Sequence, residues 1–331
     1  MARIDFHTHS LCSDGSFSPA GLAAHAKELG LKGFALTDHD TIAGLAEAQE
    51  EAARLGVGFL PGMEMSLFYR GRRLHVVALG FDSGHPAFQS LYRHIRSIKE
   101  SGIERILAGV KARGLEIHKA DVVPFAFGDL VDLYAVMRYI ISLGCYESAS
   151  EIWDRYLDPA VAEAGLEHDV TPEEALSAIR AAGGVTSLAH FHKTIGLKGL
   201  TDDETEEAIQ ELKGFGLDGM EQFYPNYTVR DMAFAGYLIH KYGLLATGGS
   251  DFHGKNRPMS KWASARMAIS LCRRRFGKKW RNGSMSGGDR KAAVRIALCA
   301  DRFPSFLQSR LRGVRRCFLS LPPLTSRLPI C

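Results

Sequence analysis

The sequence lacks features that would place it in several other classes of protein. No run of 18 uncharged apolar residues occurs in the 331-residue chain, so we expect no membrane-spanning helix. The N-terminus, Met-Ala-Arg-Ile-Asp-Phe-His, has no apolar signal segment. None of the six cysteines forms a Cys-x-x-Cys pair, and only Cys12 and Cys145 lie outside residues 272–331. We therefore expect neither a disulfide framework nor a zinc knuckle, and we predict a cytoplasmic, reducing location.

Common catalytic motifs are also absent. The chain has no Gly-x-Ser-x-Gly elbow, no phosphate-binding Gly-x-x-x-x-Gly-Lys-[Ser/Thr] loop, and no Gly-x-Gly-x-x-Gly after its first predicted strand. These absences argue against a serine hydrolase, a P-loop enzyme and a dinucleotide cofactor. Hydrophobic residues make up 46% of the chain and charged residues 24%, which is ordinary for a globular protein.

The net charge of +4 averages two different segments. Residues 272–331 hold 15 of the 41 Lys and Arg but only Asp289 and Asp301 among the acids, a net charge of +13 that leaves −9 on the rest. Such a basic tail either binds nucleic acid or a membrane surface, or is solvated and has no partner. Its Arg, Ser and Cys content and its lack of periodicity suggest a native extension or a shifted reading frame.

Short apolar runs alternate with amphipathic stretches through most of the chain. We predict helices over Pro19–Gly30, Thr41–Gly56, Pro172–Gly183, Asp202–Gly214 and Val229–Gly243. We predict strands over Ala2–His9, Gly33–Asp38, Val57–Phe68, Leu74–Phe81, Val185–His190, Gly219–Phe223 and Leu244–Asp251. Seven strands with helices between them favour an α/β fold of barrel type.

Local signals place several boundaries. Ser18 and Thr171 are predicted to cap the helices that follow them, and Asp40 is predicted to cap a helix that starts at Thr41. The polar turn Arg70-Gly71-Arg72-Arg73 joins the third and fourth strands.

The alternation is interrupted once. Residues 86–165 have a mostly helical pattern, so we predict a helical insertion between two parts of the barrel, residues 1–85 and 166–271. The basic tail, residues 272–331, is predicted to be poorly ordered.

Histidines and carboxylates recur where the predicted strands end. In α/β barrels the C-terminal strand edge carries the chemistry, and six of the seven strands deliver such a residue there. His7 and His9, two residues apart, share one face of a strand and can bind the same ion. The full set comprises His7, His9, Asp14, His39, Glu64, His75, His190, Asp251 and His253.

Nine such groups exceed what one tetrahedral ion needs. With three or four protein ligands per ion they would hold two or three divalent ions, and mixed imidazole and carboxylate ligands suit manganese, zinc or iron. A close cluster of ions can hold a bridging hydroxide and neutralise phosphoryl oxygens. The sequence therefore predicts metal-dependent hydrolysis.

The chain resembles the PHP (polymerase and histidinol phosphatase) family of metal-dependent phosphoesterases. The resemblance covers about residues 2–258 and rests on six motifs: HTHS at 7–10, SDG at 13–15, TDHDT at 37–41, GMEMS at 62–66, LAH at 188–190 and GGSDFHG at 248–254. It implies a distorted seven-stranded (β/α) barrel.

The resemblance also implies a three-metal site. On that pattern one ion is held by His7, His9 and Asp251, with Glu64 bridging to a second ion that His75 and His190 complete. A third ion is held by Asp14, His39 and His253. A hydroxide that bridges the metal ions would attack the substrate. The residues that hold it through those ions would be Glu64, Asp251, His7 and His9.

Two departures from the family pattern affect the substrate. Family members usually place proline after the fifth-strand histidine, whereas this chain has Phe191-His192-Lys193. They also commonly carry a Gly-Arg-Pro-His run in the insertion, and here residues 127–131 read Phe-Gly-Asp-Leu-Val. The candidate substrate contacts near the motifs are His192, Lys193, Lys255 and Arg257.

The leading hypothesis is hydrolysis of a phosphate ester of a nucleotide or short oligonucleotide. The order of the motifs resembles stand-alone enzymes that dephosphorylate nucleoside 3′,5′-bisphosphates or trim short oligonucleotides. The alternatives are a histidinol-phosphate phosphatase and an inactive metal-binding domain tethered to nucleic acid by the basic tail. No membrane partner is expected, and the oligomeric state is left open.

Overall fold

The computed structural model describes residues 4–127, 131–146, 149–165, 170–193 and 195–256. The basic tail and Arg257 lie outside these residues. Within them, no helix has the length and apolar character needed to cross a membrane.

A seven-stranded sheet forms the centre of the described chain, in the order β1 to β7. The strands are β1 (Ile4–Asp5), β2 (Gly33–Leu36), β3 (Gly58–Tyr69), β4 (Arg72–Leu79), β5 (Val185–Leu188), β6 (Gly219–Phe223) and β7 (Leu245–Gly248). Neighbouring strands are parallel, except that β4 runs antiparallel to both β3 and β5. The predicted α/β class and all seven strands are confirmed.

The segments after the two outermost strands also meet. His9 N donates to Phe252 O at 2.9 Å, and Asp251 N donates to His7 O at 3.0 Å. These bonds place the first and last ligand motifs of the sequence side by side.

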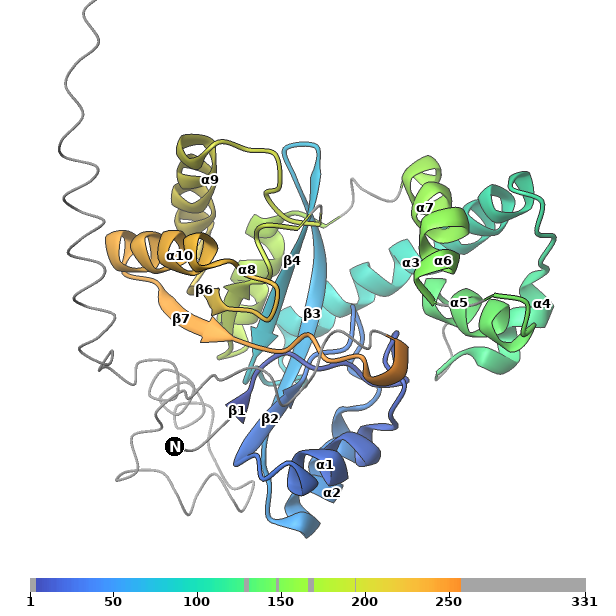
Figure 1. Cartoon of the computed structure of the whole chain (residues 1–331), viewed down its shortest axis with the longest axis horizontal. Helices are drawn as coiled ribbons and strands as arrows, with labels where there is room; N and C mark the ends of the chain where they lie inside the picture. Colours follow the sequence, from blue (N-terminus) through green and yellow to red (C-terminus); the bar gives the residue numbers. More distant parts are fainter. Residues whose placement is uncertain (1–3, 128–130, 147–148, 166–169, 194, 257–331) are drawn as a thin grey trace, which may run out of the picture. The chain divides into compact units, whose positions relative to one another are not determined.

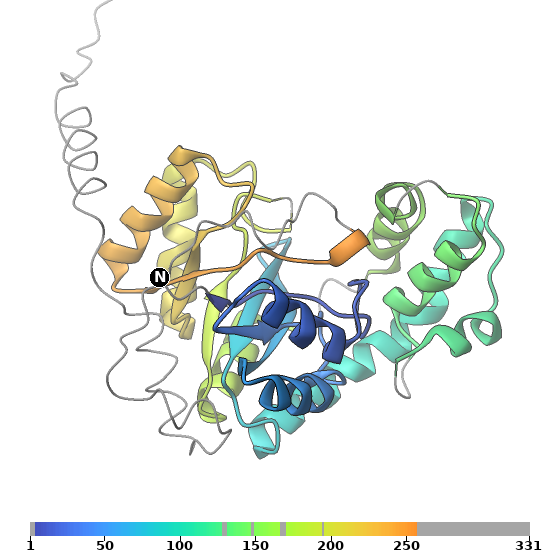
Figure 2. The ribbon, with the colours of Figure 1, turned by 60° about the horizontal axis from the view of Figure 1, so that its bottom comes forward.

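Helices cover the sheet between successive strands. They are α1 (Pro19–Glu28), α2 (Leu45–Leu55), α8 (Pro172–Ala181), α9 (Asp202–Phe215) and α10 (Val229–Tyr242). In Figures 1 and 2, α1 lies beside α2, and α9 lies beside α10. Ser18 accepts a hydrogen bond from Gly21 N, and Thr171 accepts one from Glu174 N, so both predicted caps are confirmed.

The predicted cap at Asp40 is wrong. Helix α2 begins four residues later than expected, at Leu45, with Gly44 as its N-cap. Asp40 instead has a positive φ of 53° and accepts a hydrogen bond from Ser66 N at 2.7 Å. The Asp40 carboxylate therefore binds the backbone of β3 and does not cap a helix.

The chain between β4 and β5 is helical. It contains α3 (Pro86–Ala112), α4 (Lys119–Val122), α5 (Leu133–Ser142), α6 (Ala149–Ile152) and α7 (Asp158–Ala164), with a 3₁₀ turn at Val123–Phe125 and a π-helical turn at Trp153–Leu157. At 1.5 Å per residue, α3 is about 40 Å long. Phe88 and Ile95 in its first half pack in the core beside the sheet, whereas Ile103 and Val110 pack with α5 and α7 in a separate apolar core.

Candidate metal centre

One edge of the sheet brings together all nine side chains predicted to bind metal. Each is buried, with at most 7% of the residue exposed. They are His7, His9, Asp14, His39, Glu64, His75, His190, Asp251 and His253. His75 reaches this edge because β4 runs antiparallel, so that the start of β4 lies where the parallel strands end.

Glu64 lies at the centre of the cluster. Its Oε2 is 3.1 Å from His7 Nε2, 3.2 Å from His9 Nε2 and 3.1 Å from His39 Nδ1. Its Oε1 is 3.0 Å from both His75 Nδ1 and His190 Nε2. The two oxygens of this carboxylate thus face different histidines, as a bridging ligand requires.

Three overlapping groups of ligand atoms have the spacing of metal sites. In each group the atoms lie within 4.8 Å of one another. The groups are His7, His9, Glu64 and Asp251; His9, Asp14, His39 and His253; and His39, Glu64 and His75. His9 and His39 each belong to two groups, and His190 joins through Glu64, so the division differs from the one that the family resemblance implies.

Further polar residues bind the predicted ligands through atoms that do not face the centre of the cluster, and so fix their orientation. Glu221 Oε1 is 2.8 Å from His7 Nδ1, and its Oε2 accepts a hydrogen bond from His190 N at 2.7 Å. Asp251 Oδ2 accepts from both Lys193 Nζ and Tyr224 OH at 2.8 Å. Because Oδ2 is occupied, the other oxygen of Asp251 faces the histidines, at 3.2 Å from His9 Nε2.

Backbone strain is concentrated in this region. Four non-glycine residues have positive φ in the described chain, and three of them, Asp40, His190 and Asp251, lie in or beside the cluster. Such conformations cost about 1–3 kcal/mol each and persist where surrounding contacts enforce them. The hydrogen bonds that His190 N donates to Glu221 Oε2 and that Asp251 N donates to His7 O enforce two of these conformations.

Two carboxylates of the cluster, Asp251 and Glu64, have a lowered pKa that favours their charged form. Burial opposes the charging of Asp251, but Lys193 first, and then His253 and His7, hold its pKa well below the usual value. Burial likewise opposes the charging of Glu64, whereas His7, His75 and His39 hold its pKa well below the usual value. Burial lowers the pKa of His190, which favours the neutral imidazole that binds metal.

The residues of the cluster fit divalent metal ions. Buried ligand atoms without a hydrogen-bond partner include His7 Nε2, His9 Nε2, His39 Nδ1, Glu64 Oε2 and His75 Nδ1. Leaving several such atoms unsatisfied is costly, and a metal-ligand bond removes that cost. Imidazole nitrogens together with carboxylate oxygens are the donors that manganese, zinc and iron use.

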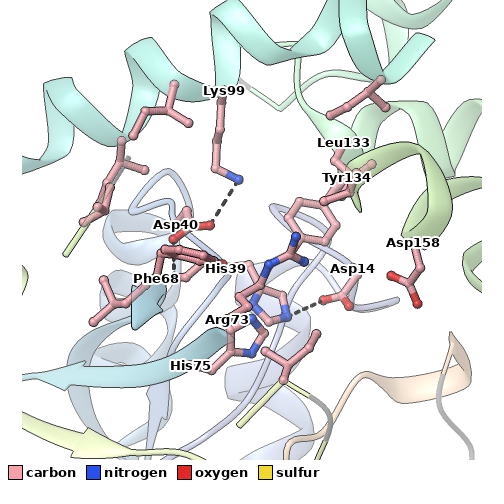
Figure 3. Close-up of a pocket in the computed structure, with 18 of the residues that line it drawn as sticks. Asp14, His39, Asp40, Phe68, Arg73, His75, Lys99, Leu133, Tyr134 and Asp158 are labelled. Carbon is pink, nitrogen blue, oxygen red and sulfur yellow. Dashed lines mark hydrogen bonds and ion pairs between the residues drawn. The ribbon is translucent and has the colours of Figure 1, made fainter. Parts of the chain in front are cut away.

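A cavity of about 270 Å³ opens beside the cluster. Asp14, His39 and His75 form part of its wall, and Figure 3 shows them beneath Lys99 of α3 and Tyr134 of α5. The Tyr134 ring stacks on the His39 imidazole at 5.4 Å with an angle of 8° between the rings. The helical segment thus covers the predicted metal ligands on this side.

The predicted substrate contacts have different surroundings. Lys193 binds Asp251, and His192 packs edge-on against Tyr227 with 4.6 Å between ring centroids. Lys255 is exposed after the last motif, and Arg257 lies outside the described residues. Neither Lys193 nor His192 lines the cavity.

No motif in the sequence indicates the residues that the helical segment adds to the cavity. Tyr134 and Trp153 come from a helical region without a motif, and their ring centroids lie 5.9 Å apart. The sequence predicts Arg73 in a turn, whereas the structure places it in β4, which begins at Arg72. Alternation along that strand would have revealed Arg73, because it is two residues before His75.

Comparisons with known proteins identify the family. Residues 5–168 match the PHP domain family. The chain is 30% identical over 261 residues to a 3′,5′-nucleoside bisphosphate phosphatase of Chromobacterium violaceum, covering 76% of this chain and 88% of that protein. It is 29% identical over 251 residues to a 5′-3′ exoribonuclease of Haemophilus influenzae, covering 76% and 90%. The chain belongs to the PHP domain family, as its motifs predict.

Another relative and a solved structure agree with this assignment. A phosphoribosyl 1,2-cyclic phosphate 1,2-diphosphodiesterase of Eggerthella lenta is 32% identical over 267 residues, covering 76% of this chain and 94% of that protein. A solved structure from Bifidobacterium adolescentis, described as a proposed metal-dependent phosphoesterase, has a TM-score of 0.67 and 27% identity. The match covers 77% of this chain and 89% of that one.

Proposed function

We propose that this chain hydrolyses a phosphate ester of a nucleotide or short oligonucleotide with the help of divalent metal ions. It is a phosphoric ester hydrolase of the PHP family, and its curated relatives include a nucleotide phosphatase and an exoribonuclease. The observation that carries the proposal is the convergence of nine buried ligand residues beside a cavity.

The ligand residues would hold two or three ions of manganese, zinc or iron. His7, His9 and Asp251 would serve one ion, His75 and His190 a second, and Asp14, His39 and His253 a third. Glu64 would bridge the first two. When bound, such ions supply a hydroxide nucleophile at neutral pH and positive charge for the phosphoryl oxygens.

The chain's own residues prepare this chemistry. Glu221 fixes the orientation of the His7 ring, and Tyr224 and Lys193 fix the carboxylate of Asp251. Tyr134 covers His39 and limits the access of water from the side of α5. Lys193 is also our first candidate for a contact with the phosphate, with His192, Lys255 and Arg257 as further candidates.

We also propose the finer organisation that the sequence predicts. The sheet would close as a distorted barrel formed by residues 1–85 and 166–271, with residues 86–165 as a helical insertion. The hydrogen bonds between the segments that follow β1 and β7 support closure. Contact of the basic tail with nucleic acid and a cytoplasmic location stay predictions.

The test begins with the purified full chain, stripped of metal by a chelator and reloaded with manganese. Release of phosphate is measured with nucleoside 3′,5′-bisphosphates, short oligonucleotides, a ribose cyclic phosphate and histidinol phosphate. We expect turnover with a nucleotide substrate, and its loss in the His7→Ala, Asp251→Ala double variant. The control is His94→Ala, because His94 pairs with Glu174 on the surface. Turnover that persists in the double variant would overturn the proposal.

A further inference from the structure

The loop that follows β1, residues 10–16, carries Asp14, the carboxylate of one group of predicted ligands. Asp14 Oδ2 is 3.1 Å from His253 Nε2, and its Oδ1 is 3.7 Å from His39 Nε2 and 3.8 Å from His9 Nδ1. The other three members of this group are histidines. Asp14 is therefore the only carboxylate of its group, and an ion bound there depends on where the loop places it.

The two peptide groups that flank Asp14 are held by side chains from distant segments. Asn256, just after the last motif, donates from Nδ2 to Asp14 O at 2.8 Å. On the other side, Arg138 of α5 donates from Nη1 to Ser13 O at 2.5 Å. Because a peptide group is planar, fixing the Ser13 oxygen restricts the direction in which the chain enters Asp14. Arg138 thus acts on the orientation of the carboxylate through the backbone.

The sheet holds this loop through other atoms. Asp38, which follows β2, accepts from Ser10 N at 2.7 Å, from Ser10 Oγ at 2.6 Å and from Ser13 Oγ at 2.6 Å. Both oxygens of Asp38 are acceptors here, so they do not serve the carbonyls of Leu11 and Ser13. Arg138 Nη1 serves both of these carbonyls, with 3.0 Å to Leu11 O. The helical segment thus holds the part of the loop that Asp38 does not.

The guanidinium of Arg138 is itself fixed within the helical segment. Its Nε donates to Phe125 O at 2.8 Å, its Nη2 is 4.0 Å from Asp132 Oδ1, and its Cζ lies 4.8 Å from the centre of the Phe127 ring. The side chain is 13% exposed, and it is not among the residues that line the cavity. Its contact with the loop is therefore separate from the aromatic wall of the cavity.

We propose that Arg138 is a positioning residue that aligns Asp14 for one metal ion of the cluster, so that the helical segment takes part in assembling the metal site. The inference rests on the proposed function, since it takes the group that contains Asp14 to hold one of several ions. The carboxylates of the other groups, Glu64 and Asp251, lie outside the loop of residues 10–16. Loss of Arg138 therefore weakens the binding of one ion selectively.

The test titrates the metal-free full chain with manganese by calorimetry and resolves the ions by their affinities. We expect Arg138→Met, which keeps an unbranched apolar stem but no donors, to weaken one ion by about 10–100-fold, the range for residues that support a ligand, and to leave the others unchanged. Asp14→Asn should weaken the same ion, so adding Arg138→Met to Asp14→Asn should have little further effect. Arg138→Lys should recover part of the loss, because both carbonyls accept from a single nitrogen.

The matched control is Arg113→Met. Arg113 lies in the same helical segment, and its guanidinium also donates to a backbone carbonyl, Gly109 O at 2.7 Å, and pairs with Glu163 of α7. If Arg138 only stabilised the helical segment, the two variants would change manganese binding equally. Arg113→Met should leave it unchanged.

Four results would overturn the proposal: equal losses in Arg138→Met and Arg113→Met, unchanged manganese binding in Arg138→Met, an equal loss of all ions, or a wild type that binds fewer than two ions. If Arg138→Met does not fold, Arg138→Lys decides, because it should weaken the same ion by a smaller factor and unchanged binding would contradict the proposal. Phosphate release is measured separately, so a wild type that shows the selective loss but hydrolyses no ester would refute the proposed function alone.

Discussion

The ligand-bearing edge of the sheet and the helical segment between β4 and β5 form the same cavity in different ways. The edge contributes buried polar residues that are strained and fixed by hydrogen bonds, such as His190 and Asp251. The helical segment has its own apolar core and contributes aromatic rings, Tyr134 and Trp153. Among the contacts that join them, Tyr134 stacks on His39, Arg138 donates to the carbonyls of Leu11 and Ser13, and Lys99 pairs with Asp40.

This difference indicates that metal binding and substrate selection are separable. Changes at the edge should abolish metal binding and turnover together, because each ligand depends on its neighbours. Changes in the helical wall should alter the affinity for substrate while the metal stays bound. The following predictions test that division, from the largest expected effect to the smallest.

Glu64→Gln should have the largest effect. The glutamine amide has no negative charge to balance the surrounding histidines and metal ions. Only its oxygen can act as a ligand or hydrogen-bond acceptor, because the nitrogen is a donor. We expect bound manganese and turnover to fall by more than about 100-fold, beyond the range for residues that only support a ligand. Elemental analysis and phosphate release measure the two losses, and Glu174→Gln on the surface is the control. Normal metal content in Glu64→Gln would contradict the account.

Gly249→Ala should damage the same site through the backbone. A Cβ at Gly249 would collide with Cβ of His7, so the segment that follows β1 must shift. We expect a loss of stability of about 1–3 kcal/mol together with loss of manganese, measured by denaturant unfolding and elemental analysis. Gly214→Ala is the control, since an added Cβ there meets no atom within 4 Å. A Gly249→Ala variant that retains full manganese content would show that metal binding does not depend on the position of His7.

Glu221→Gln should have a smaller effect on the same measurement. Glu221 belongs to none of the three groups of ligand atoms, but it contacts His7 Nδ1 and accepts a hydrogen bond from His190 N. Loss of such a supporting carboxylate typically costs about 10–100-fold in metal affinity. Manganese titration of the metal-free protein measures it. An unchanged affinity would mean that the His7 ring is oriented by other contacts.

Trp153→Ala should change substrate affinity and leave the metal in place. Loss of one stacking surface is worth about 1–3 kcal/mol, so we expect KM to rise by roughly tenfold or more with manganese content unchanged. Trp153→Phe should recover most of the affinity. A fall in metal content equal to that of Glu221→Gln would break the division between edge and wall.

The sheet and the ligand set could be predicted because their signals are local. Each strand is a short apolar run, and the ligands follow these runs at the end where an α/β sheet carries its chemistry. A short turn after Tyr69 makes β4 run antiparallel to β3. This explains why His75, near the start of its strand, lies beside residues at the ends of the parallel strands.

The cavity wall could not be predicted because it depends on packing between distant segments. Nothing near Tyr134 in the sequence indicates contact with His39, more than 90 residues away, and nothing near Trp153 indicates contact with Tyr134. The sequence could not distinguish the two roles of Asp40, because a helix N-cap and an acceptor for a strand N–H can be the same residue type. The division of ligands among ions also stays a prediction, since His9 and His39 lie close to two groups each.

The most direct test of the central claim is anomalous diffraction from crystals of the manganese-loaded protein. The account predicts two or three manganese peaks within the cluster bounded by His7, Asp14, Glu64 and Asp251, beside the cavity that Trp153 lines. A protein that is active with manganese but shows no peak among these residues would contradict it.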